Sequence, residues 1–207
     1  MKVVIFDMDG TVIDSGEAIY KTVNEVRDEL NLPPLDKEFI IKAINEPGRN
    51  LALEFYGIDT PSRSLKEGFE EKFKKFYDEC ATTYDGVKEL LQKCKEAQYK
   101  VVLASNAPHD TLEKILKKNE IYELFDEVIG ASKEIPQKPD PAMLHLAVSK
   151  TKANKAIFVG DSLKDELAAK NANMPYVQVC WGFGEESKTA TYNAKNVSEA
   201  WEIILNF

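Results

Sequence analysis

Two aspartates, Asp7 and Asp9, follow directly after the apolar run Val3–Phe6, within the sequence DMDGT. Side chains at the carboxyl end of a strand in an open α/β sheet face the crevice where ligands bind. Two carboxylates held this close repel each other unless a cation lies between them, and Mg²⁺ is a hard cation that prefers oxygen ligands. In such a site one carboxylate can attack phosphorus and the other can exchange a proton. The alternative is a pair of turn acids without chemistry.

Three further polar motifs follow other apolar runs. They are Ser105-Asn106 after 101–104, Lys138 in KPDP, and Asp161 with Asp165 in GDSLKD after 156–159. Hydroxyl and amide groups can hold phosphate oxygens, and a lysine ammonium suits a phosphate or an aspartyl phosphate. Asp165, four residues after Asp161, points to the same side of a starting helix, which suits one magnesium ligand and one supporting partner. Taken alone, these motifs are better explained as a polar turn, a solvated lysine before a helix and a helix cap.

The four motifs together are more specific than any one of them. Each follows a predicted strand, so we expect all four at one edge of one sheet. They would supply a nucleophile, a metal site, a phosphate-binding group and a cation for the developing charge. Phosphoryl transfer requires these parts.

The elements that must position these residues alternate between strands and helices. Short runs rich in Val and Ile favour strands buried on both faces. They are Val3–Phe6, Val101–Ala104, Val128–Ile129, Ala156–Val159 and Tyr176–Val179. Helical patterns lie between most of them, at 86–97, 111–118, 141–149, 163–173 and 198–205. The alternation predicts an α/β fold with a parallel sheet and right-handed crossovers.

One long stretch, from about Ser15 to Ala81, breaks this alternation. It shows no convincing buried strand, and its apolar spacing indicates helices at 17–30, 36–44, 49–56 and 64–80. We therefore expect an all-helical cap domain over residues 15–81, inserted into a core formed by residues 1–14 and 82–207.

Composition narrows the class of protein. The formal net charge of −8 argues against nucleic-acid or anionic-membrane binding, although a metal and a few basic groups can still attract an anionic substrate. The three cysteines show no metal-binding spacing, and an odd number does not form a disulfide framework. The sequence contains neither a signal-peptide pattern nor an apolar run long enough to span a membrane. We expect a cytoplasmic protein.

The four motifs DMDGT, SN, KPDP and GDSLKD resemble, in order, those of the haloacid dehalogenase superfamily of phosphotransferases. The resemblance covers the predicted core and implies a Rossmann-like, three-layer α/β/α fold with the first strand central. The inserted helices resemble the family's small α-helical cap. The sequence is most similar to phosphoglycolate phosphatase-like and sugar-phosphate phosphatase members, and CWGFG at 180–184 resembles their loop after the fifth strand.

The resemblance also implies roles for individual residues. Asp7 is the expected nucleophile and Asp9 the general acid and base, and this second acid separates the phosphatases from the dehalogenases. Mg²⁺ would bind Asp7, the main-chain carbonyl of Asp9, and Asp161. Asp165 would act through water or by holding the catalytic Lys138. The groups expected to bind the phosphoryl group are Ser105, Asn106 and Lys138.

Substrate choice is expected to lie in the cap, within Asn45–Asn50 of the sequence NEPGRN. Arg49 could bind a substrate carboxylate or second phosphate through two hydrogen bonds, or simply face solvent. The main hypothesis is a magnesium-dependent phosphatase acting on small phosphomonoesters through an aspartyl phosphate on Asp7. The first alternative is a sugar phosphomutase of the β-phosphoglucomutase type, mildly disfavoured because Ala107 and Pro108, rather than a basic residue, follow the SN motif. A remote alternative is a non-catalytic phosphometabolite-binding protein. We expect a monomer or homodimer.

Overall fold

The computed structural model describes residues 1–46 and 48–207. Pro47, which belongs to the predicted specificity segment, lies outside the described residues. The chain divides into two compact units. The first, the α/β unit, comprises Met1–Ile13 and Thr83–Phe207, and the second, the helical unit, comprises Asp14–Thr82.

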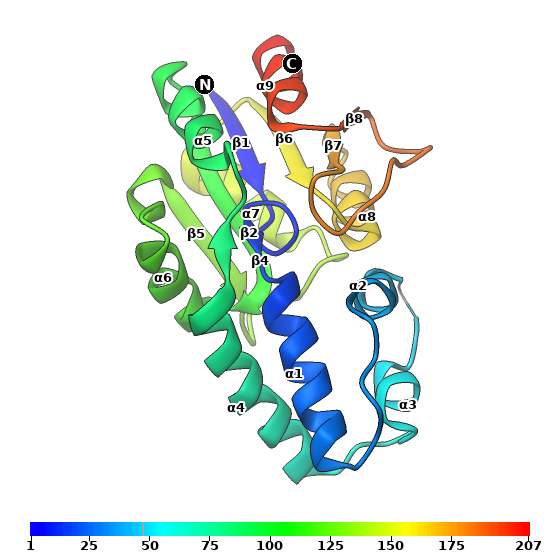
Figure 1. Cartoon of the computed structure of the whole chain (residues 1–207). Helices are drawn as coiled ribbons and strands as arrows, with labels where there is room; N and C mark the ends of the chain where they lie inside the picture. The colour runs from blue at the N-terminus through cyan, green and yellow to red at the C-terminus, as the bar shows by residue number, and fades with distance from the viewer. Residues whose placement is uncertain (47) are drawn as a thin grey trace. The chain divides into compact units, whose positions relative to one another are not determined.

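The α/β unit is built on a six-stranded parallel sheet with the order β5-β4-β1-β6-β7-β8 (Figure 1). The strands are β1 (Lys2–Phe6), β4 (Lys100–Pro108), β5 (Glu127–Ala131), β6 (Lys155–Gly160), β7 (Tyr176–Val179) and β8 (Tyr192–Ala194). In the register, Ile5 of β1 lies opposite Val102 of β4 and Phe158 of β6. The predicted α/β fold and the central position of the first strand are confirmed.

Helices cover both faces of the sheet because its crossovers run in two directions. From β4 to β5 the chain moves outward through α6 (His109–Lys118), and from β5 to β6 it returns through α7 (Ala142–Thr151). Right-handed crossovers in opposite directions place their helices on opposite faces. The helix α8 (Leu163–Asn171) shares the face of α7, whereas α5 (Val87–Glu96) and α9 (Val197–Asn206) lie on the face of α6 (Figure 1).

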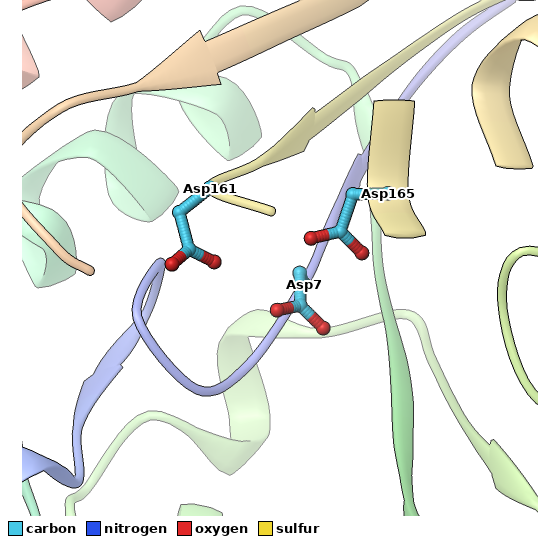
Figure 2. A group of neighbouring side chains, drawn as sticks. All are labelled: Asp7, Asp161 and Asp165. Carbon is cyan, nitrogen blue, oxygen red and sulfur yellow. The ribbon is translucent and has the colours of Figure 1, made fainter. Parts of the chain in front are cut away.

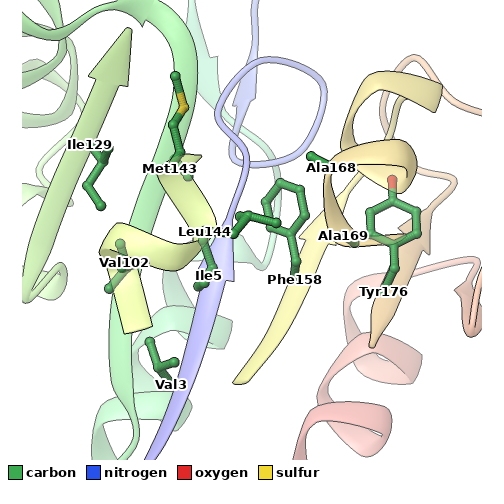
Figure 3. Close-up of a cluster of buried hydrophobic side chains, with 12 residues drawn as sticks. Val3, Ile5, Val102, Ile129, Met143, Leu144, Phe158, Ala168, Ala169 and Tyr176 are labelled. Carbon is green, nitrogen blue, oxygen red and sulfur yellow. The ribbon is translucent and has the colours of Figure 1, made fainter. Parts of the chain in front are cut away.

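The core beneath α7 and α8 explains the apolar runs of the sequence. Alternate residues of each strand point to this face, and the small Ala168 and Ala169 let α8 approach the sheet closely (Figure 3). The buried cluster comprises Val3, Ile5, Val102, Ala104, Ile129, Met143, Leu144, Ala147, Phe158, Ala168, Ala169 and Tyr176. Because the alternate set, including Val4 and Phe6, is buried on the other face, the central strands carry continuous apolar runs.

The helical unit contains α1 (Gly16–Glu29), α2 (Lys37–Asn45), α3 (Leu51–Tyr56) and α4 (Arg63–Cys80). Its own core is small and comprises Val23, Ile40, Ala43 and Phe55. The buried Arg27 donates hydrogen bonds to the carbonyls of Pro33 and Phe55, so it links α1 to the segments that follow. Two short strands, β2 (Ile13–Asp14) and β3 (Thr82–Thr83), form a separate two-stranded sheet.

Several local features differ from the sequence expectations. The strand β4 extends to Pro108, past a register irregularity between Ser105 and Pro108, so Ser105 and Asn106 lie in the strand rather than after it. The edge strand β8 and the short 3₁₀ helix η1 (Tyr122–Leu124) were not predicted, because β8 is short and polar and lacks an apolar run. The three cysteines are free, as expected. Among the described residues, no helix is both long and apolar enough to cross a membrane.

Candidate active site

The carboxyl edge of the sheet brings four predicted site residues into one buried cluster, here called the acidic cluster. It comprises Asp7 after β1, Lys138 between β5 and α7, Asp161 after β6, and Asp165 in the first turn of α8. Carboxylate oxygens of the three aspartates lie within 4.8 Å of one another and point toward a common space (Figure 2). Strand order explains the gathering, because β1 and β6 are neighbours and end at the same edge.

Lys138 links two of the acids. Its Nζ lies 2.5 Å from Asp7 Oδ1 and 2.6 Å from Asp165 Oδ1, and it also lies 5.2 Å from the centre of the Phe158 ring. Only 2% of the Lys138 side chain is exposed. A buried ammonium needs such partners, because removing it from water without them is very unfavourable.

Asp165 is held rigidly by its own helix. Its Oδ2 accepts hydrogen bonds from Ser162 N at 3.1 Å and from Ser162 Oγ at 2.6 Å, and its backbone N–H donates to Ser162 Oγ. This is a capping box at the start of α8. Both oxygens of Asp165 are therefore engaged, one with Lys138 and the other with Ser162.

Asp161 is only partly satisfied. Its Oδ1 accepts a hydrogen bond from Thr11 Oγ1 at 3.2 Å, but among the described residues its buried Oδ2 has no hydrogen-bond partner. The loop after β1 (residues 7–12), here called the β1 loop, lies close to Asp161. A Cβ atom at Gly10, which has φ +82°, would overlap the Asp161 carboxylate. A buried anionic oxygen without a donor is strongly unfavourable, so this atom indicates a place for a bound cation.

The acidic cluster has an excess of negative charge. Burial and the nearby Asp165 raise the pKa of Asp7 to about 7, although Lys138 opposes the shift. Burial, with repulsion from Asp165 and Asp7, raises the pKa of Asp161 well above its usual value. Burial alone would lower the pKa of Lys138, but the two carboxylates outweigh it and the net pKa is raised. With all groups ionised, three carboxylates face one ammonium, and two negative charges remain uncompensated.

The side chain of Asn106 forms hydrogen bonds with the backbone of Lys138. The Asn106 side chain accepts from Lys138 N at 2.7 Å and donates to Lys138 O at 3.0 Å, while Gln137 Nε2 donates to the Asn106 carbonyl. The neighbouring Ser105 is buried, and its Oγ accepts from Ala107 N at 3.1 Å. The Asn106 amide, predicted to bind the phosphoryl group, thus holds the loop that carries Lys138.

Asp9 and Arg49 lie outside the acidic cluster. Asp9 is half-buried in the β1 loop, and its charge adds a smaller repulsion that raises the pKa of Asp7 further. Arg49 belongs to the helical unit, where its guanidinium pairs with both carboxylate oxygens of Glu54 and, at 2.8 Å, with Glu46. The two donors with which Arg49 could bind an anion therefore already bind Glu54 within the helical unit.

The sequence analysis assigned no site role to two residues that support the site, the buried Gln178 and the partly buried Trp181. Gln178 of β7 is 3% exposed and donates from Nε2 to the carbonyl of Asp161 at 2.7 Å. Trp181 donates from Nε1 to the carbonyl of Thr11 at 3.0 Å. One signal was available, because a glutamine in an otherwise apolar buried strand must satisfy its amide inside the protein.

The residues present fit a hard dication. Mg²⁺ takes oxygen ligands, and the cluster offers several carboxylate oxygens, one of them unpartnered, with two uncompensated negative charges. Nitrogen and sulfur ligands, which zinc and copper favour, are absent from the group of candidate metal ligands among the described residues.

Comparisons with known proteins identify the family of the chain and several relatives. A family model described as haloacid dehalogenase-like hydrolase matches residues 4–179. A phosphoglycolate phosphatase from Vibrio parahaemolyticus is 27% identical over 99% of this chain and 96% of its own length. Pyrophosphatase PpaX from Listeria monocytogenes is 32% identical over 86% of this chain and 82% of its own. A crystal structure from Haemophilus somnus, named as a predicted phosphoglycolate phosphatase, has the same fold, with TM-score 0.82, 23% identity, and coverage of 99% of this chain and 98% of that one.

Proposed function

This chain belongs to the haloacid dehalogenase-like hydrolases and is a phosphatase, and from that premise we propose that it hydrolyses small phosphate esters with Mg²⁺ through an aspartyl phosphate on Asp7. The observation that carries the proposal is the acidic cluster, a buried group of three carboxylates with one ammonium, in which Asp161 Oδ2 has no hydrogen-bond partner within the described part of the chain.

Asp7, Asp161 and the main-chain carbonyl of Asp9 would hold the ion. When bound, Mg²⁺ supplies positive charge that favours the ionised form of Asp7 and stabilises charge on the phosphoryl oxygens. Asp165 serves differently, because its two oxygens hold Lys138 and the start of α8. Lys138 thus stays fixed beside Asp7, where its charge stabilises the transferring phosphoryl group.

The reaction has two displacement steps. A carboxylate oxygen of Asp7 forms a bond to phosphorus as the bond from phosphorus to the leaving oxygen breaks, and Asp9 donates a proton to that oxygen. Asp9, now ionised, takes a proton from water, whose oxygen attacks phosphorus. The bond from phosphorus to Asp7 breaks, which releases inorganic phosphate and regenerates both carboxyl groups. Ser105 assists by binding a phosphoryl oxygen.

The substrate class follows from the relatives' names. Phosphoglycolate and pyrophosphate both place a second anionic group close to the phosphoryl group, and the relatives are named for acting on them. We propose a small phosphate with an anionic leaving group. The helical unit would act as a cap. Arg49 would release its ion pair with Glu54 and bind the second anionic group of the substrate instead.

A substrate panel tests this function. Phosphoglycolate, pyrophosphate, hexose phosphates, phosphogluconate and nucleoside monophosphates are incubated with the chain in Mg²⁺ and in EDTA, and free phosphate is measured. We expect phosphate release with Mg²⁺ and none with EDTA. Isomerised sugar phosphate without free phosphate would instead support a phosphomutase, and no turnover of any compound would contradict the proposal.

Asp7→Asn tests the nucleophile separately. The change keeps the size of the side chain but removes the attacking carboxylate, and we expect kcat to fall by at least about 10⁴-fold. Acid-quenched wild-type protein incubated with ³²P-labelled substrate should carry label that this variant lacks. Retained magnesium-dependent turnover in Asp7→Asn would rule out the assignment.

A further inference from the structure

The segment that begins in β7 and continues through residues 181–184 lies against both loops that carry candidate metal ligands. We propose that Gln178 and Trp181 are positioning residues that hold the β1 loop and the Asp161 loop at a fixed separation and thereby set the magnesium affinity of the acidic cluster. The inference rests on the proposed function, because it assigns these residues to the metal site of that reaction.

Gln178 fixes the backbone of the Asp161 loop. Its Nε2 donates to Asp161 O at 2.7 Å and to Val179 O at 3.2 Å, and its Oε1 accepts from Tyr176 Oη at 3.1 Å. Tyr176 Oη also lies 3.3 Å from Ser162 O. The buried amide is therefore used on both ends, which fixes its orientation and directs one N–H at the residue that carries the unpartnered oxygen.

Trp181 fixes the other loop. Its indole Nε1 donates to Thr11 O at 3.0 Å, across 170 residues of sequence. The hydroxyl of Thr11 in turn donates to Asp161 Oδ1 at 3.2 Å. A continuous chain of hydrogen bonds thus runs from Trp181 through the β1 loop to the Asp161 carboxylate.

Two glycines allow the same segment to lie directly on both loops. A Cβ atom at Gly182 would overlap the carbonyl of Gly10, and one at Gly184 would overlap the carbonyl of Asp161. Just beyond the segment, Ser187 Oγ donates a hydrogen bond to the buried Glu166 at 2.7 Å. The segment is therefore built to fit these two loops closely.

The separation of the loops matters because Mg²⁺ requires nearly ideal octahedral geometry with oxygens at about 2.0–2.1 Å. The proposed ligands come from both loops, since Asp7 and Asp9 belong to one and Asp161 to the other. Loss of a residue that orients metal ligands commonly weakens metal affinity by about 10–100-fold. We therefore expect changes at Gln178 and Trp181 to act on the magnesium dissociation constant.

The test is a magnesium titration of the purified full chain without substrate. The rise in melting temperature with Mg²⁺ concentration gives the dissociation constant. Gln178→Leu removes the amide at similar volume, and Trp181→Phe removes only the indole donor. Thr151→Val is the matched control, because it deletes a buried hydroxyl bonded within α7 at 2.7 Å, away from the site. We expect a dissociation constant about 10–100-fold higher for Gln178→Leu, a smaller increase for Trp181→Phe, and none for Thr151→Val. At saturating Mg²⁺, kcat should recover toward wild type in both variants.

A second readout uses the two tryptophans of the chain. In a Trp201→Phe background the emission of Trp181 should change on addition of Mg²⁺, because its indole is bonded to the loop that would hold the ion. Lower stability with wild-type magnesium affinity in both positioning variants would overturn the inference. Failure of the wild-type chain to bind Mg²⁺ would instead overturn the proposed function, so the two failures are distinguishable. If Gln178→Leu does not fold, Trp181→Phe decides the question.

Discussion

The two edges of the same sheet carry charged clusters of opposite character. At the amino edge, Asp126 precedes β5 and accepts hydrogen bonds from Lys95 at 2.6 Å, Lys100 at 2.8 Å and Val101 N at 2.9 Å. Although burial opposes the shift, the lysine hydrogen bonds lower the pKa of Asp126. At the carboxyl edge, burial and mutual repulsion raise the pKa values of Asp7 and Asp161.

This contrast separates a structural ion cluster from a site prepared for a ligand. Around Asp126 every strong acceptor has a donor and positive charge exceeds negative charge, so the cluster is complete. The acidic cluster combines three carboxylates with one ammonium, and among the described residues one of its oxygens has no hydrogen-bond partner, so its fully ionised form is unfavourable without a further cation. Residue type alone does not distinguish the two edges, since both combine aspartate with lysine.

Among the changes that compare the two edges, the largest expected effect comes from removing the ammonium of Lys138 from the acidic cluster. Lys138→Met keeps the length of the side chain but removes the ammonium that would stabilise the phosphoryl charge beside Asp7, and we expect kcat to fall by about 10²–10³-fold. Steady-state kinetics at saturating Mg²⁺ measure it. Lys95→Met at the amino edge is the control and should keep wild-type kcat. Equal kcat in wild type and Lys138→Met would show that the contrast between the edges has no catalytic meaning.

The pH dependence of stability should have opposite signs at the two edges. The pKa of Asp7 is raised from 3.8 to about 7, so the folded, metal-free chain binds more protons than the unfolded chain. Its stability therefore falls as the pH rises from about 4 to 7, by roughly a few kcal/mol. Urea unfolding in EDTA at pH 5 and pH 8 measures the change. Asp7→Asn should flatten the profile, and Mg²⁺ at pH 8 should restore stability. A metal-free wild type that is more stable at pH 8 than at pH 5 would contradict this expectation.

The amino edge provides the matching prediction. Because the pKa of Asp126 is lowered on folding, its contribution is complete above the pKa of the unfolded state and is lost as the pH falls through the folded value. Asp126→Asn should lower the free energy of unfolding by about 1–3 kcal/mol at pH 7 and by less in acid. Urea unfolding gives the loss, and kcat should stay at the wild-type value. A fall in kcat would mean that the amino edge also supports catalysis.

The smallest expected effect concerns Asn106. Asn106→Ala removes both side-chain hydrogen bonds to the Lys138 backbone, and we expect kcat to fall about tenfold, equivalent to about 1.4 kcal/mol. If Asn106 instead bound the substrate and the transition state equally, its removal would raise KM and leave kcat unchanged. The split between kcat and KM therefore decides between positioning and direct phosphate binding. Gln137→Ala, which removes only the donor to the Asn106 carbonyl, is the control.

The gathering of the candidate site residues at one edge of the sheet was predictable because the connections between parallel strands follow few patterns. Continuous apolar runs predict strands buried on both faces, and right-handed crossovers bring their carboxyl ends to one edge. The gathering of Asp7, Lys138 and Asp161 followed from this geometry together with the family resemblance. The roles of these residues, like the assignment of residues 15–81 as a cap, stay predictions.

The sequence by itself therefore determined the fold, the edge that holds the chemistry and the residue types placed there, because these depend on local apolar pattern and on strand order. Only the tertiary structure decided which polar groups satisfy one another. It paired Asn106 with the Lys138 backbone, Gln178 with Asp161, and Trp181 with Thr11. Among residues 1–46 and 48–207, it left Asp161 Oδ2 without a hydrogen-bond partner. Such pairings depend on hydrogen-bond distances and angles between residues far apart in the chain, which no local pattern encodes.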